Sequence, residues 1–377
     1  MTSFEMMQQH YRQRDLAARE WKKNGGKVVG YFCDSVPEEL ILAAGFFPLR
    51  LSGDPHGSTD VARKNVITRF VNREGFVHSM LNMLLTGKYD FLDFLVIPHA
   101  RDSVHRLYQL LVVLKESNPA LKLPELFFLD SAHTTFYSAG VYLHDRIVEL
   151  KKQLEAWAGK RITNKALSQA IAITNENKTW LKQVAALRAA TPPRISGVAS
   201  LQIIGSAMFM LKEEHNRQLK DFLKGADKLP ARDGARLFVD GSPLDNLQLY
   251  EIIESEKATV VAEDHCWGNR YSDVPIDTSL DPLAAIIDRY HNKSPCPRMY
   301  PMSRLIDYCR QSAVEAKAQG AICHVFEFDV AEDWTAPDKI KALEEAGMRT
   351  LHLKNQPYLI SEPEKLKASI KELVASI

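Results

Sequence analysis

Several signatures that would assign a function directly are missing from this sequence. No Gly-x-Gly-x-x-Gly follows an expected strand and no Walker loop is present, so we do not expect this chain to hold a nucleotide by itself. The Gly-x-Ser-x-Gly elbow of hydrolases and histidine-rich metal spacing are also absent. Function must therefore be argued from less specific patterns.

Cysteine is scarce and scattered. The five cysteines are odd in number and form no Cys-x-x-Cys pair: Cys33, Cys266, Cys296, Cys309 and Cys323. Neither a disulfide framework nor a zinc site is indicated, and a reducing cytoplasm is the expected compartment. Cys309 and Cys323 lie in apolar contexts that are typical of core residues.

Charge of one sign and long apolar runs are lacking as well. Lysine and arginine number 48 against 47 acidic residues, a net charge of +1. The chain therefore lacks the excess of positive charge that is typical of proteins that bind nucleic acid or an anionic membrane. No run approaches the roughly 20 apolar residues that span a bilayer, and residues 1–19 are too polar for a signal peptide. We expect a cytoplasmic protein without nucleic-acid or membrane partners.

What is present begins with a strand–helix–strand unit over residues 27–51. Residues 27–33 form a β-branched and aromatic run, and Pro37 suits the first turn of the helix that follows. Residues 47–51 resemble a second strand. In parallel sheets ligands bind at the carboxyl ends of strands, which is where Cys33 and Ser35 lie.

The remaining pattern predicts an α/β fold of two doubly wound, flavodoxin-like parallel-sheet domains with a helical insert between them. Further strands are expected at residues 94–98, 125–129, 236–239, 258–262, 321–328 and 348–353. The expected domains are residues 1–135, 136–230 and 231–377, with 137–190 helical and one helix each in 1–19 and 203–223. The similar order of elements in the two halves indicates either a duplication or the general likeness of α/β domains. A cleft between the two domains is the default ligand site.

Two polar clusters follow expected strands. One comprises His99, Arg101, Asp102 and His105, which a solvated turn and helix face would also explain. The other spans residues 263–271 and combines acids, a thiol, aromatic rings and a guanidinium, a combination that a salt-bridge network would also produce. The candidate cleft residues are Cys33, Ser35, Glu39, His99, Asp102, Cys266 and Arg270.

Several motifs together resemble one family. They are Val-Gly-Tyr-Phe-Cys at 29–33, Leu-Thr-Gly-Lys-Tyr-Asp-Phe-Leu-Asp at 85–93, Ile-Pro-His at 97–99, Glu-Asp with Cys, Gly and Arg-Tyr within 263–271, and Cys-Pro at 296–297. The chain resembles the 2-hydroxyacyl-CoA dehydratase family, which includes the core subunits of ATP-dependent (class I) benzoyl-CoA reductase. The amino-acid sequence of residues 25–33 and the length of the chain are most similar to those of the smaller core subunit of that reductase.

The departures from this family are specific. The resemblance implies three thiolate ligands of an iron–sulfur cluster, but the matching positions carry Glu74, Arg101 and Asp329. Such clusters need soft thiolates, and a guanidinium cannot ligate metal. Residues 355–358, Asn-Gln-Pro-Tyr, replace the family's usual glycine- and arginine-bearing ending. We expect no cofactor or metal in this chain, and we hypothesise that Glu74, Arg101 and Asp329 form a salt-bridge network in the vacated site.

The resemblance implies a subunit that pairs with a larger, cluster-bearing paralogue. Electrons would come from a separate ATP-hydrolysing iron–sulfur activator. The expected reaction is reduction of benzoyl-CoA, or a methylated analogue, to a cyclic diene, with the aryl-CoA mainly in the partner. The alternatives are radical dehydration of a 2-hydroxyacyl-CoA, and a non-catalytic scaffold or maturation role.

Overall fold

The fold is built on two four-stranded parallel sheets. A computed structural model describes residues 1–64 and 74–377. The first sheet has the order β2-β1-β3-β4 and the second the order β6-β5-β7-β8. The strands are β1 (Val28–Tyr31), β2 (Phe47–Arg50), β3 (Phe94–Pro98), β4 (Glu125–Leu129), β5 (Ala235–Gly241), β6 (Ala258–Asp264), β7 (Gly320–Phe326) and β8 (Arg349–Gln356). The predicted fold class is confirmed, and both sheets share one strand order.

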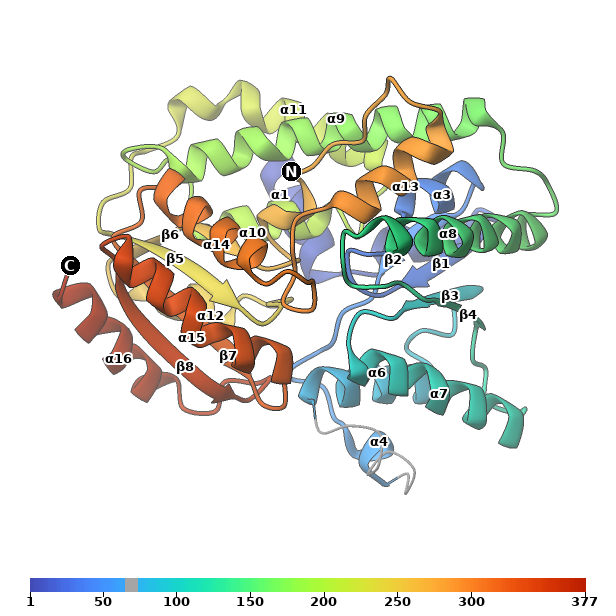
Figure 1. Ribbon diagram of the computed structural model, residues 1–377, viewed down its shortest axis with the longest axis horizontal. Coiled ribbons are helices and arrows are strands. Elements are labelled where there is room, and N and C mark those ends of the chain that lie inside the picture. The colour runs from blue at the N-terminus through green and yellow to red at the C-terminus, as the bar shows by residue number, and fades with distance from the viewer. Residues whose placement is uncertain (65–73) are drawn as a thin grey trace.

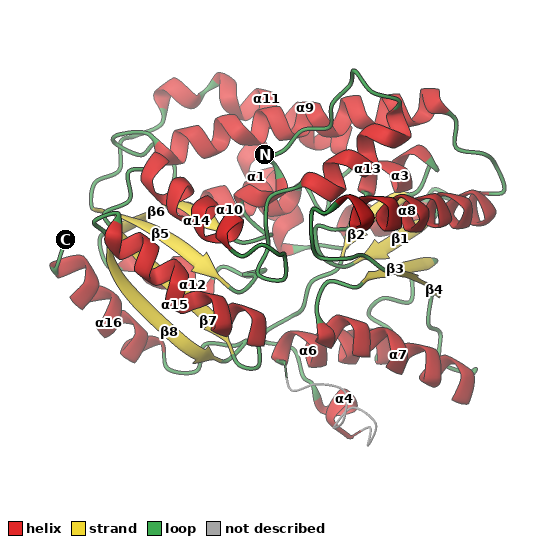
Figure 2. Ribbon diagram, viewed as in Figure 1, coloured by secondary structure: helices red, strands yellow, loops and turns green. Residues whose placement is uncertain are grey.

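The strands form because short apolar runs are covered on both faces. β3, Phe-Leu-Val-Ile-Pro, is buried at every position, as is β1. Continuous apolar runs are typical of parallel sheets with helices on both sides. Figure 2 shows helices flanking each sheet in this way.

Helices make up most of the remaining described chain. They are α1 (Ser3–Arg12), α2 (Leu16–Lys23), α3 (Glu38–Ala43), α4 (Asp60–Lys64), α6 (Gly75–Leu85), α7 (Asp102–Ser117), α8 (Tyr137–Ala158), α9 (Asn164–Ala189), α10 (Gly197–Ser206), α11 (Lys212–Lys224), α12 (Gln248–Ser255), α13 (Pro282–Asn292), α14 (Ser303–Glu315), α15 (Val330–Glu345) and α16 (Pro363–Ala375). None of the helices in the described ranges is long and apolar enough to cross a membrane.

The two long helices that follow β4 in the chain, α8 and α9, pack in different places. α8 packs on the first sheet, where Leu143 and Ile147 join the core that contains Val29 and Phe94. The long helix α9 instead contacts α3 beside the first sheet and β6 of the second. In Figure 1 it runs across the top of both halves. α9 therefore ties the two sheets together.

The two sheets present their switch points to each other. In each sheet the strand order reverses between two neighbouring strands, β1 and β3 in the first and β5 and β7 in the second. The β5 end approaches β7 so closely that a Cβ on Gly241, whose φ is +124°, would lie 2.0 Å from the His324 carbonyl oxygen. Ligands of open α/β sheets bind outside such points, so the chain segments that follow these four strands are the place to look for a site.

Candidate functional site

Arg101 lies at the centre of the site, between the two halves of the chain. It directly precedes α7, after β3. Its Nη1 donates to the Glu74 carboxylate at 2.9 Å, and its Nη2 donates to Asp329 at 2.5 Å. Glu74 precedes α6 of the first half, whereas Asp329 follows β7 of the second. All three side chains are buried, so one cation joins two carboxylates from opposite switch points.

Asp329 is the most heavily bonded member of this network. Besides Arg101 it accepts hydrogen bonds from Arg298 at 2.9 Å and from the Ser242 hydroxyl at 2.8 Å. Burial alone would raise the pKa of Asp329, but Arg101, Arg298 and Ser242 outweigh it and lower the pKa to about 2. Asp329 is therefore a carboxylate at physiological pH.

The pKa of Glu74 shifts in the opposite direction. Burial raises the pKa of Glu74, because desolvation outweighs the attraction of Arg101 and the neighbouring Asp329 charge adds to the increase. The Arg101 pKa is itself raised, since the two carboxylates outweigh the desolvation of the guanidinium. Arg101 stays charged, and its charge keeps both acids in place.

The residues at these positions do not fit an iron–sulfur cluster. Two hard carboxylates surround a guanidinium that has no lone pair to offer a metal. Elsewhere in residues 1–64 and 74–377, one trio of potential ligands has its ligand atoms within 4.8 Å of one another: Asp240, Asp264 and Cys309. Asp240 already accepts from the Lys339 ammonium at 2.8 Å. We therefore derive no chemistry through a bound metal.

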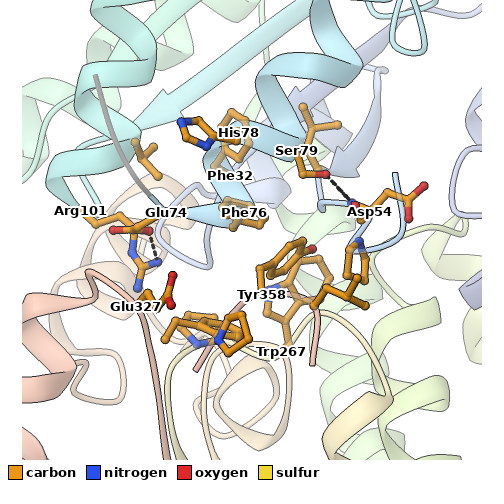
Figure 3. Close-up of a pocket in the computed structure, with 18 of the residues that line it drawn as sticks. Phe32, Asp54, Glu74, Phe76, His78, Ser79, Arg101, Trp267, Glu327 and Tyr358 are labelled. Atoms are coloured by element: carbon orange, nitrogen blue, oxygen red, sulfur yellow. Dashed lines mark hydrogen bonds and ion pairs between the residues drawn. The ribbon is translucent and has the colours of Figure 1, made fainter. Parts of the chain in front are cut away.

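A cavity of about 360 Å³ opens beside the Arg101 network. Phe32 and Phe76 line it from the first half, and Trp267, Phe326 and Tyr358 line it from the second. Figure 3 shows Phe76 facing Tyr358 and Trp267 across the cavity, with Arg101, Glu74 and Glu327 at one side. Neighbouring rings meet edge to face, with centroids 6.0 Å apart for Phe76 and Tyr358 and 5.8 Å apart for Phe326 and Tyr358. The cavity lies within the size range of small-molecule sites and has their mixture of aromatic walls and a few charges.

Arg101 also lines a second, smaller cavity of about 80 Å³. Cys33, Ser35, Cys266 and Arg270 line it together with Arg101. The Ser35 hydroxyl and one Arg270 nitrogen are buried there without a hydrogen-bond partner among the described residues. Such groups are commonly satisfied by ordered water in a polar space of this size.

Comparison with known proteins assigns the family. The family model described as 2-hydroxyglutaryl-CoA dehydratase, D-component, matches residues 33–373. This chain belongs to that D-component family. The match includes every strand of both sheets except β1, and it includes all three residues of the Arg101 network.

Relatives of this D-component protein are subunits of acyl-CoA enzymes. It is 26% identical to the (R)-phenyllactyl-CoA dehydratase beta subunit of Clostridium sporogenes, over 88% of this chain and 86% of the relative. It is 27% identical to a benzoyl-CoA reductase subunit of Thauera aromatica, over 71% of this chain and 69% of the relative. It is also 27% identical to the beta subunit of (R)-2-hydroxyglutaryl-CoA dehydratase of Acidaminococcus fermentans, over 86% of each chain.

The structure gathers only some of the candidate cleft residues of this D-component protein. Cys33 and Cys266 line both cavities, and Ser35 and Arg270 line the smaller one. Asp102 is instead exposed at the start of α7, whereas Val104 in the same turn is buried and lines the larger cavity.

Glu39 and His99 also differ from the expectation. Glu39 is fully buried on α3, where it pairs with Lys178 at 3.3 Å and accepts from the Tyr290 hydroxyl at 3.0 Å. This pairing joins α3 to α9 and α13. His99 contacts Asp130 at 2.7 Å at the carboxyl ends of β3 and β4. Neither side chain lines the two cavities.

Residues 263–271 form the salt-bridge network that was the alternative interpretation of this loop. Arg188 of α9 pairs with Glu263, and Arg270 pairs with Asp264, with all four side chains buried. Gly268 packs against the Glu263 carboxylate, which also accepts from the Asn269 backbone at 2.7 Å. The loop is held rigidly by charge, and it positions Cys266 and Trp267 at the cavity.

Three residues that shape the larger cavity were not among the candidate cleft residues, although Trp267 lies in the cluster at 263–271. They are Arg50 at the end of β2, Trp267, and Tyr358 after β8. The Tyr358 hydroxyl donates to Asp245 at 2.8 Å. A Cβ on Gly53 would lie 2.4 Å from the Tyr358 hydroxyl oxygen, and a Cβ on Gly75 would lie 2.6 Å from the Tyr358 Cβ. A charge that ends an otherwise buried strand was the available signal for Arg50.

Proposed function

We propose that this chain is the non-cluster-binding subunit of a heterodimeric enzyme that acts on a CoA thioester. Glu74, Arg101 and Asp329 stand where the resemblance places three thiolate ligands, and this ion network is the observation that carries the proposal. Its larger partner would hold the cluster and most of the acyl-CoA site. An ATP-hydrolysing iron–sulfur activator would deliver the electrons.

The reaction that we favour is reduction of benzoyl-CoA, or a methylated analogue, to a cyclic dienoyl-CoA. This choice is supported by the amino-acid sequence of residues 25–33 and by the similarity to the benzoyl-CoA reductase relative. Dehydration of a 2-hydroxyacyl-CoA is the second candidate, because other relatives are named as dehydratase beta subunits. A scaffold or maturation role is the non-catalytic alternative.

The partner is proposed to cover an exposed aromatic surface at the start of α8, formed by Phe136, Tyr137 and Tyr300. Their exposed fractions are 55%, 88% and 63%, and the Phe136 and Tyr300 rings lie 5.9 Å apart. Obligate subunit interfaces are large and apolar. The occupant we propose is the larger paralogue, in keeping with relatives that are named as subunits.

Coexpression with a cluster-bearing paralogue tests the proposal. We expect a stable one-to-one complex, activity that requires both chains and the activator, and an inactive isolated chain. Tyr137→Glu should weaken assembly, whereas Val113→Glu on α7, also exposed, should leave it unchanged. Turnover by the paralogue and activator without this chain would favour the scaffold role, and comparing benzoyl-CoA with 2-hydroxyacyl-CoA substrates separates the two reactions.

Iron and sulfide quantitation tests the cluster assignment separately. We expect no stoichiometric cluster in the anaerobically purified or reconstituted chain. About one cluster per chain, lost in Cys33→Ser or Cys266→Ser, would mean that ligation has moved to other cysteines.

A further inference from the structure

Arg50 is a buried cation that has no carboxylate partner among the described residues. Its side chain ends β2 and is 2% exposed. Nη1 donates to the Cys266 carbonyl oxygen at 2.7 Å, and Nη2 donates to the Cys266 sulfur at 2.9 Å. Its Nε is buried without a partner in the described chain. All of these acceptors are neutral groups or a thiol, so the positive charge is solvated but not neutralised.

Three other buried arginines near the site differ from Arg50 in this respect. Arg101, Arg188 and Arg270 each contact at least one carboxylate. A buried charge is costly unless it is paired. Cys266 and then the Asp34 carboxylate raise the pKa of Arg50 against the effect of burial, but Asp34 makes its ion pair with Lys293, at 2.7 Å. The charge of Arg50 is therefore available to an anion.

The residues around Arg50 indicate the chemical character that such an anion would need. The guanidinium lies 4.0 Å from the centre of the Trp267 ring, and it lines the same 360 Å³ cavity as Phe32, Phe76 and Tyr358. The Arg101 guanidinium at the side of this cavity already has two carboxylates. Of the other two acids, Asp54 pairs with Lys88 at 3.5 Å and Glu327 is exposed beside Glu74 and Arg101 (Figure 3).

We propose that this cavity binds a small organic anion with a flat apolar body. Its negative group pairs with Arg50, and its body lies between Phe76 on one side and Tyr358 and Trp267 on the other. Aromatic walls favour planar ligands that present a face or an edge, and a guanidinium favours a planar carboxylate. The site belongs to this chain alone and does not depend on the proposed subunit function.

Calorimetric titration of the purified chain tests the site with three probes: 2-naphthoate, its neutral isostere 2-naphthamide, and acetate. We expect 2-naphthoate to bind at least tenfold more tightly than either of the others, because naphthamide lacks the charge and acetate lacks the apolar body. Equal affinity for naphthoate and naphthamide, or no binding of naphthoate at millimolar concentration, would overturn the proposal.

Three variants locate the binding. Arg50→Met should weaken 2-naphthoate binding at least tenfold and leave 2-naphthamide unchanged. Arg14→Met is the matched control, because Arg14 also makes no ion pair in the described chain. Arg14 lines only the neighbouring cavity of about 510 Å³, which Arg50 borders as well. The Arg14→Met variant should bind naphthoate as the wild type does. Leu359→Trp, which fills the cavity from a position that is 40% exposed, should abolish binding even if Arg50→Met does not fold. Unchanged binding in Leu359→Trp would place the anion elsewhere and refute the site.

Discussion

Arg101 and Asp329, which are 228 positions apart in the sequence, are joined by a hydrogen bond of 2.5 Å. One follows a strand of the first sheet and the other follows a strand of the second. The bond therefore links two halves that share no strand. It also stands where the resemblance to acyl-CoA enzymes leads one to expect metal ligation, which makes its energetic role the first thing to test.

Replacing Arg101 should destabilise the fold strongly. In Arg101→Ala, two buried carboxylates lose a shared cation, and breaking a buried pair costs on the order of 3–5 kcal/mol. Asp329 keeps Arg298 and Ser242, so most of the loss should fall on Glu74. Denaturant unfolding should show partial recovery in Arg101→Ala/Glu74→Gln, and no more in the triple variant that adds Asp329→Asn, because Arg298 then loses its carboxylate. A near-neutral single variant would mean that the network contributes little.

Three buried histidines should make the protein sensitive to acid. Burial lowers the pKa of His265 and His324 to about 4 and that of His215 to about 3, against about 6.5 in the unfolded chain. The unfolded chain then binds more protons below pH 6.5, so stability is full above that pH and falls as the pH decreases toward 4. The slope should approach about 4 kcal/mol per pH unit for three protons.

Unfolding at pH 7, 6 and 5 checks this slope. His324→Leu should reduce it by about one proton, because that imidazole no longer titrates in the unfolded chain. His56→Asn, at an exposed position, is the matched control and should leave the slope unchanged. A flat profile in the wild type between pH 6.5 and 5 would contradict the prediction.

The thiols at the cavities should be inert in the native protein. Burial and the neighbouring Cys266 raise the pKa of Cys33 to about 12, and burial also raises the pKa of Cys266. Since the thiolate is the nucleophile, alkylation by iodoacetamide at pH 8 should be at least about 100-fold slower than in the unfolded chain. Mass spectrometry after timed quenching resolves each cysteine, and equal native and unfolded rates would show an exposed or activated thiol.

Gly268 should tolerate no side chain. An added Cβ would lie 2.2 Å from the Glu263 carboxylate oxygen, which is bonded to Arg188. Gly268→Ala should therefore cost about 1–3 kcal/mol through overpacking. Gly225→Ala is the control, since its Cβ would meet nothing closer than 3.6 Å and its effect should stay below about 1 kcal/mol. Equal unfolding midpoints for the two variants would disprove the constraint.

Much of the fold was determined by local sequence. The apolar runs of β1 and β3 predict buried strands, because such a run is visible in consecutive residues without knowing which strands pair with it. Local pattern also misleads twice: it predicts one helix over residues 203–223, which contain a break at 207–211 between α10 and α11, and one helix over residues 1–19, which contain α1 and the start of α2. In both places the residues on the two sides of the break have a helical composition, so composition alone does not mark where one helix ends and the next begins.

The site shows the same division more sharply. The sequence by itself determined the family motifs and the unusual residues Glu74, Arg101 and Asp329, because these are identities at fixed positions. Only the tertiary structure decided that Arg101 is buried between the two carboxylates, that Asp102 next to it is exposed, and that Arg50 and Tyr358 meet in one cavity. The physical reason is that pairing between residues 228 positions apart depends on how two sheets dock at their switch points, which no local period encodes.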